Sequence, residues 1–131
     1  MTTILIDTQV FVWLTNSDSR LGGKSLALLR DSSNVVAISY FSFFEIAIKS
    51  SIGKLEFDSS VIEDLDVMGI ELIMPDKQSL TNYKIYADQN KDPFDNMIIS
   101  VAKIENCALM TSDKKILSSP IKGISFLSAL D

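Results

Sequence analysis

The sequence predicts an α/β fold in which a central, mainly parallel sheet lies between two layers of helices. Two observations favour this class: short apolar segments alternate with helical segments, and no linker, internal repeat or low-complexity tract interrupts them. Strands that alternate with helices form parallel sheets covered by helices on both faces. A length of 131 residues, with 47% hydrophobic and 22% charged side chains, fits one globular domain over residues 1–131.

The predicted strands are short apolar runs bounded by polar residues or glycine. The first run ends at Asp7, the second is rich in β-branched residues and follows Asn34, and the third follows Gly69. Such runs next to turn-forming residues are typical of strands. On this basis we predict strands at residues 3–6, 35–38, 70–73, 108–110 and 124–126.

Between these runs, apolar side chains recur at helical spacing. We expect Gly53 to end one helix and Ser59 to cap the next. The segment 93–106 is the longest, and apolar residues cover most of its circumference, which predicts a buried helix. The predicted helices span residues 9–15, 24–30, 42–51, 60–68, 75–88, 93–106 and 114–117.

The composition limits the chemistry that this chain can perform. It contains no histidine and one cysteine, which excludes histidine-based triads, histidine-ligated metals and an internal disulfide. The formal net charge of −5, from 12 basic and 17 acidic residues, argues against a protein that coats nucleic acid with basic side chains. Without a signal-like start or a long apolar run, we expect a cytoplasmic protein with no membrane partner.

Four acidic residues stand at or near the predicted carboxyl ends of strands. Asp7 follows the first strand, and Asp113 follows the fourth. Glu45 lies in the helix after the second strand, and Asp95 opens the long buried helix. Ligands of open parallel sheets bind beyond these strand ends. Clustered carboxylates repel one another unless a cation or proton compensates them, and Mg²⁺ or Mn²⁺ suits an all-oxygen site.

Each of these acids also fits a helix cap, and capping is the better interpretation of any one of them alone. Segment 42–45 matches a capping box, and segment 92–95 is a close analogue with proline at its first helical position. Asp7 and Asp113 each precede a predicted helix. Because four independent caps need not meet in space, their convergence favours a metal site.

Four segments of the sequence resemble, in the same order, motifs of the PIN-domain family, in particular VapC-like toxins of type II toxin–antitoxin pairs. Segment 5–14 resembles the opening strand and helix, segment 38–55 the second acidic motif, segment 92–99 the third and segment 109–113 the fourth. The likeness covers nearly the whole chain. It implies the three-layer α/β/α PIN-like fold.

The resemblance implies a metal-dependent endoribonuclease, a phosphodiester hydrolase that uses Mg²⁺ or Mn²⁺ to activate the attacking water. It also implies RNA as substrate, a cognate antitoxin as partner and a homodimer. Asp7 and Asp95 would be direct metal ligands, and two further acids, Glu45 and Asp113, would bind directly or through water. The supporting polar residues that it implies are Ser39 and Thr111.

Two departures from the family pattern leave an alternative open. Close relatives usually carry histidine at the position of Gln9. They often carry histidine or arginine around the third motif, where this chain has Asn90, Lys91 and Asn96. The second hypothesis is therefore a catalytically weak or inactive PIN-like module that acts through a protein partner. A phosphoacceptor domain or a haloacid-dehalogenase-like hydrolase ranks lower, because no second acid accompanies Asp7.

Overall fold

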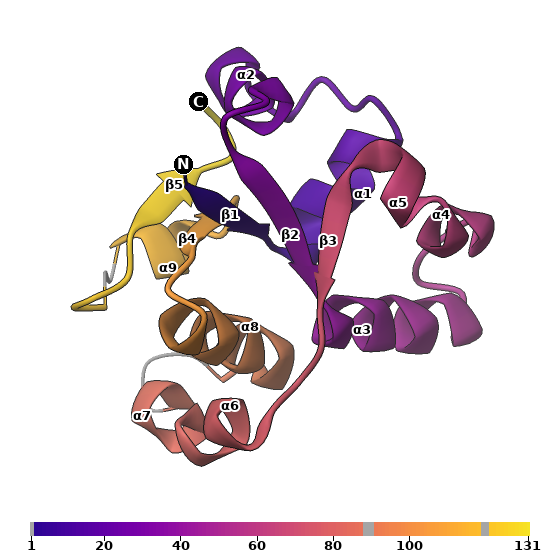
Figure 1. The fold of residues 1–131 in the computed structure, drawn as a ribbon. Helices are drawn as coiled ribbons and strands as arrows, with labels where there is room; N and C mark the ends of the chain where they lie inside the picture. Colours follow the sequence, from indigo (N-terminus) through magenta and orange to yellow (C-terminus); the bar gives the residue numbers. More distant parts are fainter. Residues whose placement is uncertain (1, 88–90, 119–120) are drawn as a thin grey trace.

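The computed structural model describes residues 2–87, 91–118 and 121–131. Its centre is a five-stranded sheet in which every pair of neighbouring strands is parallel (Figure 1). The order of the strands across the sheet is β3-β2-β1-β4-β5. The predicted parallel sheet is confirmed. The strands are β1 (Thr3–Ile6), β2 (Val35–Ser39), β3 (Ile70–Ile73), β4 (Ala108–Thr111) and β5 (Phe126–Ser128).

The strand order places β1 in the middle of the sheet and creates a switch point beside it. From β1 the chain moves outward through β2 and β3, and then crosses to the other side for β4 and β5. Ile6 pairs with Ile38 on β2 and with Met110 on β4. The backbone N–H of Asp7 extends this ladder by donating to the Met110 carbonyl over 3.1 Å. The carboxyl ends of β1 and β4 therefore stand together where an open sheet binds ligands.

Helices cover both faces of the sheet, which confirms the three-layer fold (Figure 1). Ile4 and Ile6 join one hydrophobic cluster with side chains of the first, third and fifth helices, whereas Leu5 joins another with the eighth and ninth. The helices are α1 (Thr8–Thr15), α2 (Gly23–Arg30), α3 (Tyr40–Ser51), α4 (Ser60–Glu63), α5 (Leu65–Met68), α6 (Lys77–Thr81), α7 (Tyr83–Ala87), α8 (Pro93–Ile104) and α9 (Lys114–Ser118).

Helix α8 is buried as the sequence predicts. Every residue from 96 to 102 is buried, because the sheet covers one side of the helix and α6 and α7 cover another (Figure 1). The Ser100 hydroxyl donates to the Ser79 carbonyl on α6 over 2.6 Å, which joins the two helices. Within the described ranges, no helix has both the length and the apolar character needed to cross a membrane.

Two predicted helices are each divided in the structure. Segment 60–68 turns at Asp64 and forms α4 and α5, and segment 75–88 turns at Asn82 and forms α6 and α7. Helix α4 buries no side chain, and α5 and α6 each bury one. Packing therefore does little to hold either segment in one continuous helix. The predicted helix end near Asp88 lies outside the described residues.

The last strand lies two residues later than predicted, at Phe126–Ser128 instead of 124–126. Its position follows from its neighbour, since Phe126 pairs with Leu109 of β4. The N–H of Leu109 also donates to the Ser125 carbonyl over 2.8 Å. The register of this edge strand is thus set by pairing with β4 and not by the local apolar run.

Candidate active site at the carboxyl end of the sheet

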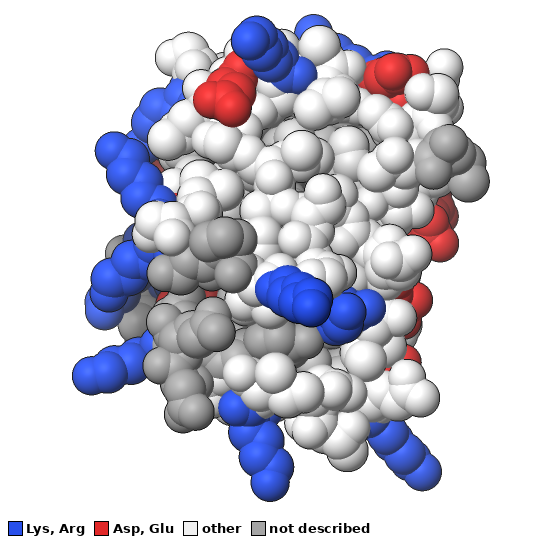
Figure 2. Space-filling model, turned by 90° about the vertical axis from the view of Figure 1, so that its left-hand side faces the viewer, with Lys and Arg blue, Asp and Glu red and all other residues white. Residues whose placement is uncertain are grey.

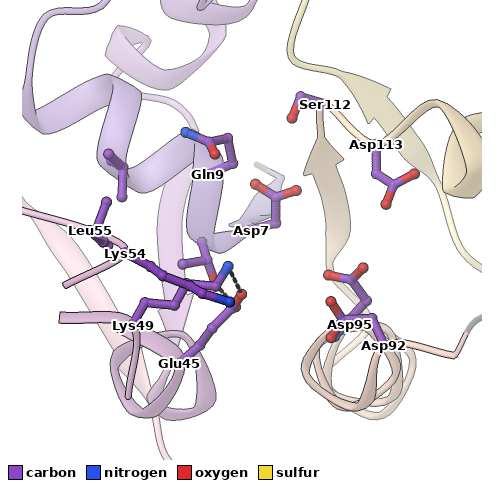
Figure 3. Close-up of a pocket in the computed structure, with 12 residues that line it drawn as sticks. Asp7, Gln9, Glu45, Lys49, Lys54, Leu55, Asp92, Asp95, Ser112 and Asp113 are labelled. Carbon is purple, nitrogen blue, oxygen red and sulfur yellow. Dashed lines mark hydrogen bonds and ion pairs between the residues drawn. The ribbon is translucent and has the colours of Figure 1, made fainter. Parts of the chain in front are cut away.

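A pocket of about 360 Å³ opens beyond the carboxyl ends of β1 and β4 (Figure 3). All four acids predicted from the sequence line it. They come from four separate segments of the chain, so the fold produces the convergence that distinguishes a shared site from unrelated caps. The lining residues are Asp7, Thr8, Gln9, Val12, Glu45, Lys49, Lys54, Leu55, Asp92, Asp95, Ser112 and Asp113.

Asp7 caps a helix and lines the pocket at the same time. Its Oδ1 accepts a hydrogen bond from the Val10 N–H over 2.8 Å, which makes Asp7 the N-cap of α1. Its Oδ2 accepts from the Thr111 hydroxyl over 2.6 Å. Burial raises the pKa of the Asp7 carboxyl, while these two hydrogen bonds oppose the rise. The capping interpretation of Asp7 is therefore confirmed without removing it from the pocket.

Thr111 links Asp7 to Asp113. It is fully buried, and its hydroxyl oxygen accepts from the Asp113 N–H over 3.0 Å while donating to Asp7. The Asp113 carboxylate accepts from the N–H groups of Lys115 and Ile116 over 2.8 and 3.3 Å, so it also caps α9. The hydrogen bonds of Thr111 fit the supporting part that the sequence predicts for it.

Ser39, the other predicted supporting residue, is not among the residues that line the pocket. It is buried at the end of β2, and its hydroxyl oxygen accepts from the Phe41 N–H over 3.1 Å as the N-cap of α3. The capping-box interpretation of segment 42–45 is wrong, because α3 begins at Tyr40 and Ser42 lies inside the helix. Pairing of Ser39 with β3 extends the strand, and the helix begins directly after it.

Asp95 lies in the first turn of α8, on the opposite side of the pocket from α3 (Figure 3). The helix start is held by Asp92, which accepts from the N–H groups of Phe94 and Asp95 over 2.9 and 3.3 Å. Burial, followed by the charges of Asp92 and Asp113, raises the pKa of Asp95 to about 7. The aspartates on this side therefore repel one another.

Glu45 is engaged on both of its carboxylate oxygens. It is buried in the second turn of α3, and the Thr8 hydroxyl donates to its Oε1 over 2.6 Å. The Lys49 ammonium donates to its Oε2 over 2.7 Å. The hydrogen bond to Glu45 is the main reason that the pKa of Lys49 is raised. The negative charge of Glu45 is thus compensated by groups of the protein itself.

Sequence reasoning missed the two lysines of the pocket. Lys49 follows Glu45 by four positions, the spacing at which an acid and a base meet on a helix, so a local signal for this pair exists. Lys54 follows Gly53, whose φ of 73° lies in the left-handed region that favours glycine. The Lys54 N–H donates to the Lys49 carbonyl over 2.9 Å, and this turn returns Lys54 to the pocket.

The positions that depart from the family pattern lie in different surroundings. Gln9 is exposed in the first turn of α1 and lines the pocket. Asn96 is buried within α8, and Lys91 is exposed before that helix. Asn90 lies outside the described residues. Of the described departures, Gln9 therefore has the most direct access to a bound ligand.

The donor atoms of the pocket suit a hard divalent cation. Carboxylate oxygens are the ligands that Mg²⁺ and Mn²⁺ prefer. Among residues 2–87, 91–118 and 121–131, no three acidic or cysteine side chains are grouped tightly enough to hold an ion as they stand. The pKa values of Asp7 and Asp95 are both raised, so a cation between these carboxylates would offset the cost of burying their charges. The chemistry of the donor set therefore suits such an ion.

Chains of three solved complexes have the same fold. The chain is 21% identical to one in VapBC2 from Rickettsia felis bound to a promoter DNA fragment, with a TM-score of 0.69 over 97% of this chain and 98% of that one. For DNA-bound VapBC from Salmonella typhimurium the identity is 19%, the TM-score 0.68 and the coverage 98% and 99%. For VapBC-1 from nontypeable Haemophilus influenzae the identity is 16% and the TM-score 0.67, over 99% of this chain and 100% of that one. At such identities the likeness concerns the fold alone.

The sequence also matches a known family model, although no curated protein matches it at a significant level. The model of the PIN domain matches residues 4–120. This range includes all of β1 except its first residue, the strands β2 to β4, and all four acids of the pocket. The resemblance carried by the four sequence motifs is therefore confirmed, and the chain belongs to the PIN domain family.

Proposed function

We propose that this protein is a Mg²⁺- or Mn²⁺-dependent endoribonuclease, the toxin of a type II toxin–antitoxin pair. The observation that carries the proposal is the convergence of four carboxylates, from four segments of the chain, on one pocket at the switch point of the sheet. Membership of the PIN domain family supports nuclease chemistry. A carboxylate site in a chain without histidine favours metal-assisted hydrolysis over histidine-based acid–base cleavage.

In this proposal Asp7 and Asp95 hold the ion directly, while Glu45 and Asp113 act directly or through water. The ion, when bound, supplies a lowered pKa for the attacking water and positive charge for the phosphate. Thr111 keeps Asp7 in place by donating to its Oδ2. Water attacks the RNA phosphodiester in line and leaves 5′-phosphate and 3′-hydroxyl ends.

Cleavage of RNA by the purified protein tests the proposal. We expect discrete cuts with Mg²⁺ or Mn²⁺, mapped by their new 5′ ends, which disappear with EDTA and in the Asp7→Asn variant. Asp66→Asn is the matched control, because Asp66 is exposed on α5 and does not line the pocket. Cuts that survive EDTA, or full activity of Asp7→Asn, would contradict the metal-dependent mechanism.

A nuclease-inactive module that acts through a protein partner is the second candidate function. It is favoured by Gln9, which lines the pocket at a position where close relatives carry histidine. EDTA-sensitive cleavage by the purified protein would exclude this candidate. Tight binding of a partner by a protein that cuts no RNA would support it.

The proposed partner is a cognate antitoxin, and the protein is proposed to act in the cytoplasm as a homodimer. The similar solved structures support such a partner, because they are described as VapBC complexes and one as a toxin–antitoxin complex. Expression alone should arrest growth, and coexpression with the neighbouring reading frame should restore it. Light scattering of the purified protein measures the oligomeric state.

A further inference from the structure

We propose that Lys49 binds the scissile phosphate of the RNA, and that Glu45 is a positioning residue that holds the Lys49 ammonium in the pocket. The inference rests on the proposed function, since it names the group that receives the substrate of the same pocket. It concerns Lys49, a residue of the pocket to which the proposed function gives no role.

The pocket has an acidic wall and a mixed wall (Figure 3). Three aspartates at the starts of α8 and α9 stand on the acidic wall. Glu45, Lys49 and Lys54, from α3 and the turn that follows it, stand on the mixed wall. Five carboxylates against two ammonium groups give the lining a formal charge of −3. A phosphodiester anion therefore meets favourable charge from the protein only on the mixed wall.

The Lys49 ammonium is held in place on one side and open on the other. Its partner Glu45 has a side chain only 8% exposed and is itself fixed by the Thr8 hydroxyl. The Lys49 side chain is 48% exposed. An ammonium carries three N–H donors, and the hydrogen bond to Glu45 uses one of them. The other donors can bind phosphate oxygens without breaking the ion pair.

The Glu45–Lys49 ion pair also lies on the side of α3 that lines the pocket. A second face of α3 carries exposed apolar side chains at every fourth position, and one of them, Phe44, has its ring centroid 6.0 Å from that of Phe94 on α8. Glu45 and Lys49 each lie one position further along, and Thr8 of α1 contacts Glu45. The ion pair is therefore directed toward α1 and the pocket. The apolar residues of that second face are Tyr40, Phe44 and Ile48, and the C-cap Ile52 continues their spacing.

One face of the molecule offers less organised positive charge than the pocket. Figure 2 shows the face that lies on the left in Figure 1, where lysines and arginines project singly or in pairs from a mostly uncharged surface. Among the described side chains visible on that face, the basic residues form no continuous stripe. A lysine fixed inside a pocket is thus better suited to place one particular phosphate than the basic side chains visible on that face.

Binding of RNA without cleavage gives the first test. A fluorescent RNA oligonucleotide is titrated by anisotropy in EDTA over a range of KCl concentrations, and its integrity is checked on a gel. Lys49→Gln should weaken binding several-fold and reduce the slope of log K against log salt by about 0.7, the value for one phosphate contact on a single strand. Lys49→Arg, which keeps the charge, should retain the slope.

Lys103→Gln is the matched control for this titration. Lys103 stands in the last turn of the 12-residue helix α8, as Lys49 stands in the last turn of the 12-residue helix α3, but it does not line the pocket. We expect Lys103→Gln to bind like the wild type. An unchanged affinity and slope in Lys49→Gln, or an equal loss in Lys103→Gln, would overturn the proposal.

Glu45→Gln tests the positioning part. The slope of log K against log salt reports how many phosphates the basic side chains neutralise, so Glu45→Gln should keep a slope near the wild-type value. Single-turnover cleavage with Mg²⁺ should show a raised KM for this variant. The double variant Glu45→Gln/Lys49→Gln leaves no unpaired carboxylate at position 45, so a loss of RNA affinity in that variant, with the fold retained by circular dichroism, is due to the lost ammonium. Wild-type KM in Glu45→Gln would overturn the positioning role.

The two proposals fail in distinguishable ways. If the wild type cuts RNA and Lys49→Gln cuts it with the same KM, the phosphate contact is wrong and the proposed function stands. If the wild type cuts no RNA, yet Lys49→Gln alone loses affinity in EDTA, the proposed nuclease function is wrong and the phosphate contact is supported. Calorimetric titration with Mn²⁺ should show that Lys49→Gln still binds the ion, which separates the phosphate contact from metal binding.

Discussion

Glu45 and Asp95 stand on opposite walls of one pocket, and their charges are compensated differently. Glu45 is the more deeply buried of the two, but Thr8 and Lys49 occupy both of its oxygens. Asp95 is partly exposed and lies among other aspartates, which together with burial raise its pKa to about 7. The comparison shows that the partners of a carboxylate, and not its depth alone, decide how costly its charge is.

The two walls therefore depend differently on a cation. The wall at α3 has its own ammonium groups, whereas on the acidic wall the charges of Asp92 and Asp113 add to the effect of burial and raise the pKa of Asp95. A metal ion stabilises a site more when its carboxylates repel one another. A carboxylate whose charge is already compensated by a cation of the protein gains less from the ion. Substitution of an acid on one wall should consequently affect catalysis and metal binding differently from substitution of an acid on the other wall.

The largest expected difference is in catalysis. Asp95→Asn removes a proposed direct ligand and should lower kcat/KM more than about 100-fold. That loss is larger than the usual effect of changing a residue that contacts the metal only through a ligand. Glu45→Gln should lower kcat/KM about 10-fold. Both values come from single-turnover cleavage of one RNA, with circular dichroism to show that the fold is retained. Equal losses would remove the distinction between the walls.

Metal binding should separate the same two variants by thermal stability. A ligand at 100 times its Kd stabilises the folded state by about 2.7 kcal/mol. Mn²⁺ should therefore raise the Tm of the wild type and of Glu45→Gln, and it should leave Asp95→Asn almost unchanged. Differential scanning fluorimetry in Mn²⁺ and in EDTA measures the shifts. A full shift in Asp95→Asn would show that Asp95 is not a ligand.

Loss of the Thr8 hydroxyl should destabilise the wall at α3. Thr8→Val leaves Oε1 of the buried Glu45 without its donor, at a cost of about 1–3 kcal/mol in the free energy of unfolding. Thr81→Val is the control, because that hydroxyl bonds to a carbonyl on the exposed surface of α6 and its loss should cost less than about 0.5 kcal/mol. Urea unfolding in EDTA compares them. Equal costs would mean that Glu45 is not held by Thr8.

The smallest effect concerns pH. Because the folded pKa of Asp95 is raised from 3.8 to about 7, the folded state binds more protons than the unfolded state between these values. The stability of the metal-free protein should therefore fall as the pH rises through that window, and the raised pKa of Asp7 acts in the same direction. Asp95→Asn should flatten the decline and raise the Tm at pH 8 by a few degrees. Thermal unfolding in EDTA at pH 5 and 8 provides the measurement.

Elements with a strong local pattern were predictable from the sequence. Strands 3–6 and 70–73 coincide with the observed strands, and the helix at 93–106 is buried as its apolar residues require. Elements whose limits depend on neighbours were not predictable. β5 takes its register from β4, and α3 begins two residues early because Ser39 belongs to β2. Segment 60–68 lacks the packing that would keep it one helix.

By itself, the sequence determined the alternation of strands and helices and put four acids near strand ends, because both follow from local order. Only the tertiary structure decided which hydroxyl groups donate to Glu45 and Asp7. The donor to Glu45 stands 37 positions away at Thr8, and the donor to Asp7 stands 104 positions away at Thr111. Such hydrogen bonds depend on the strand order, which no local pattern encodes. That is the physical reason why the hydroxyl donors of Glu45 and Asp7 could not be read from the sequence, whereas the Glu45–Lys49 pair, four positions apart on one helix, could.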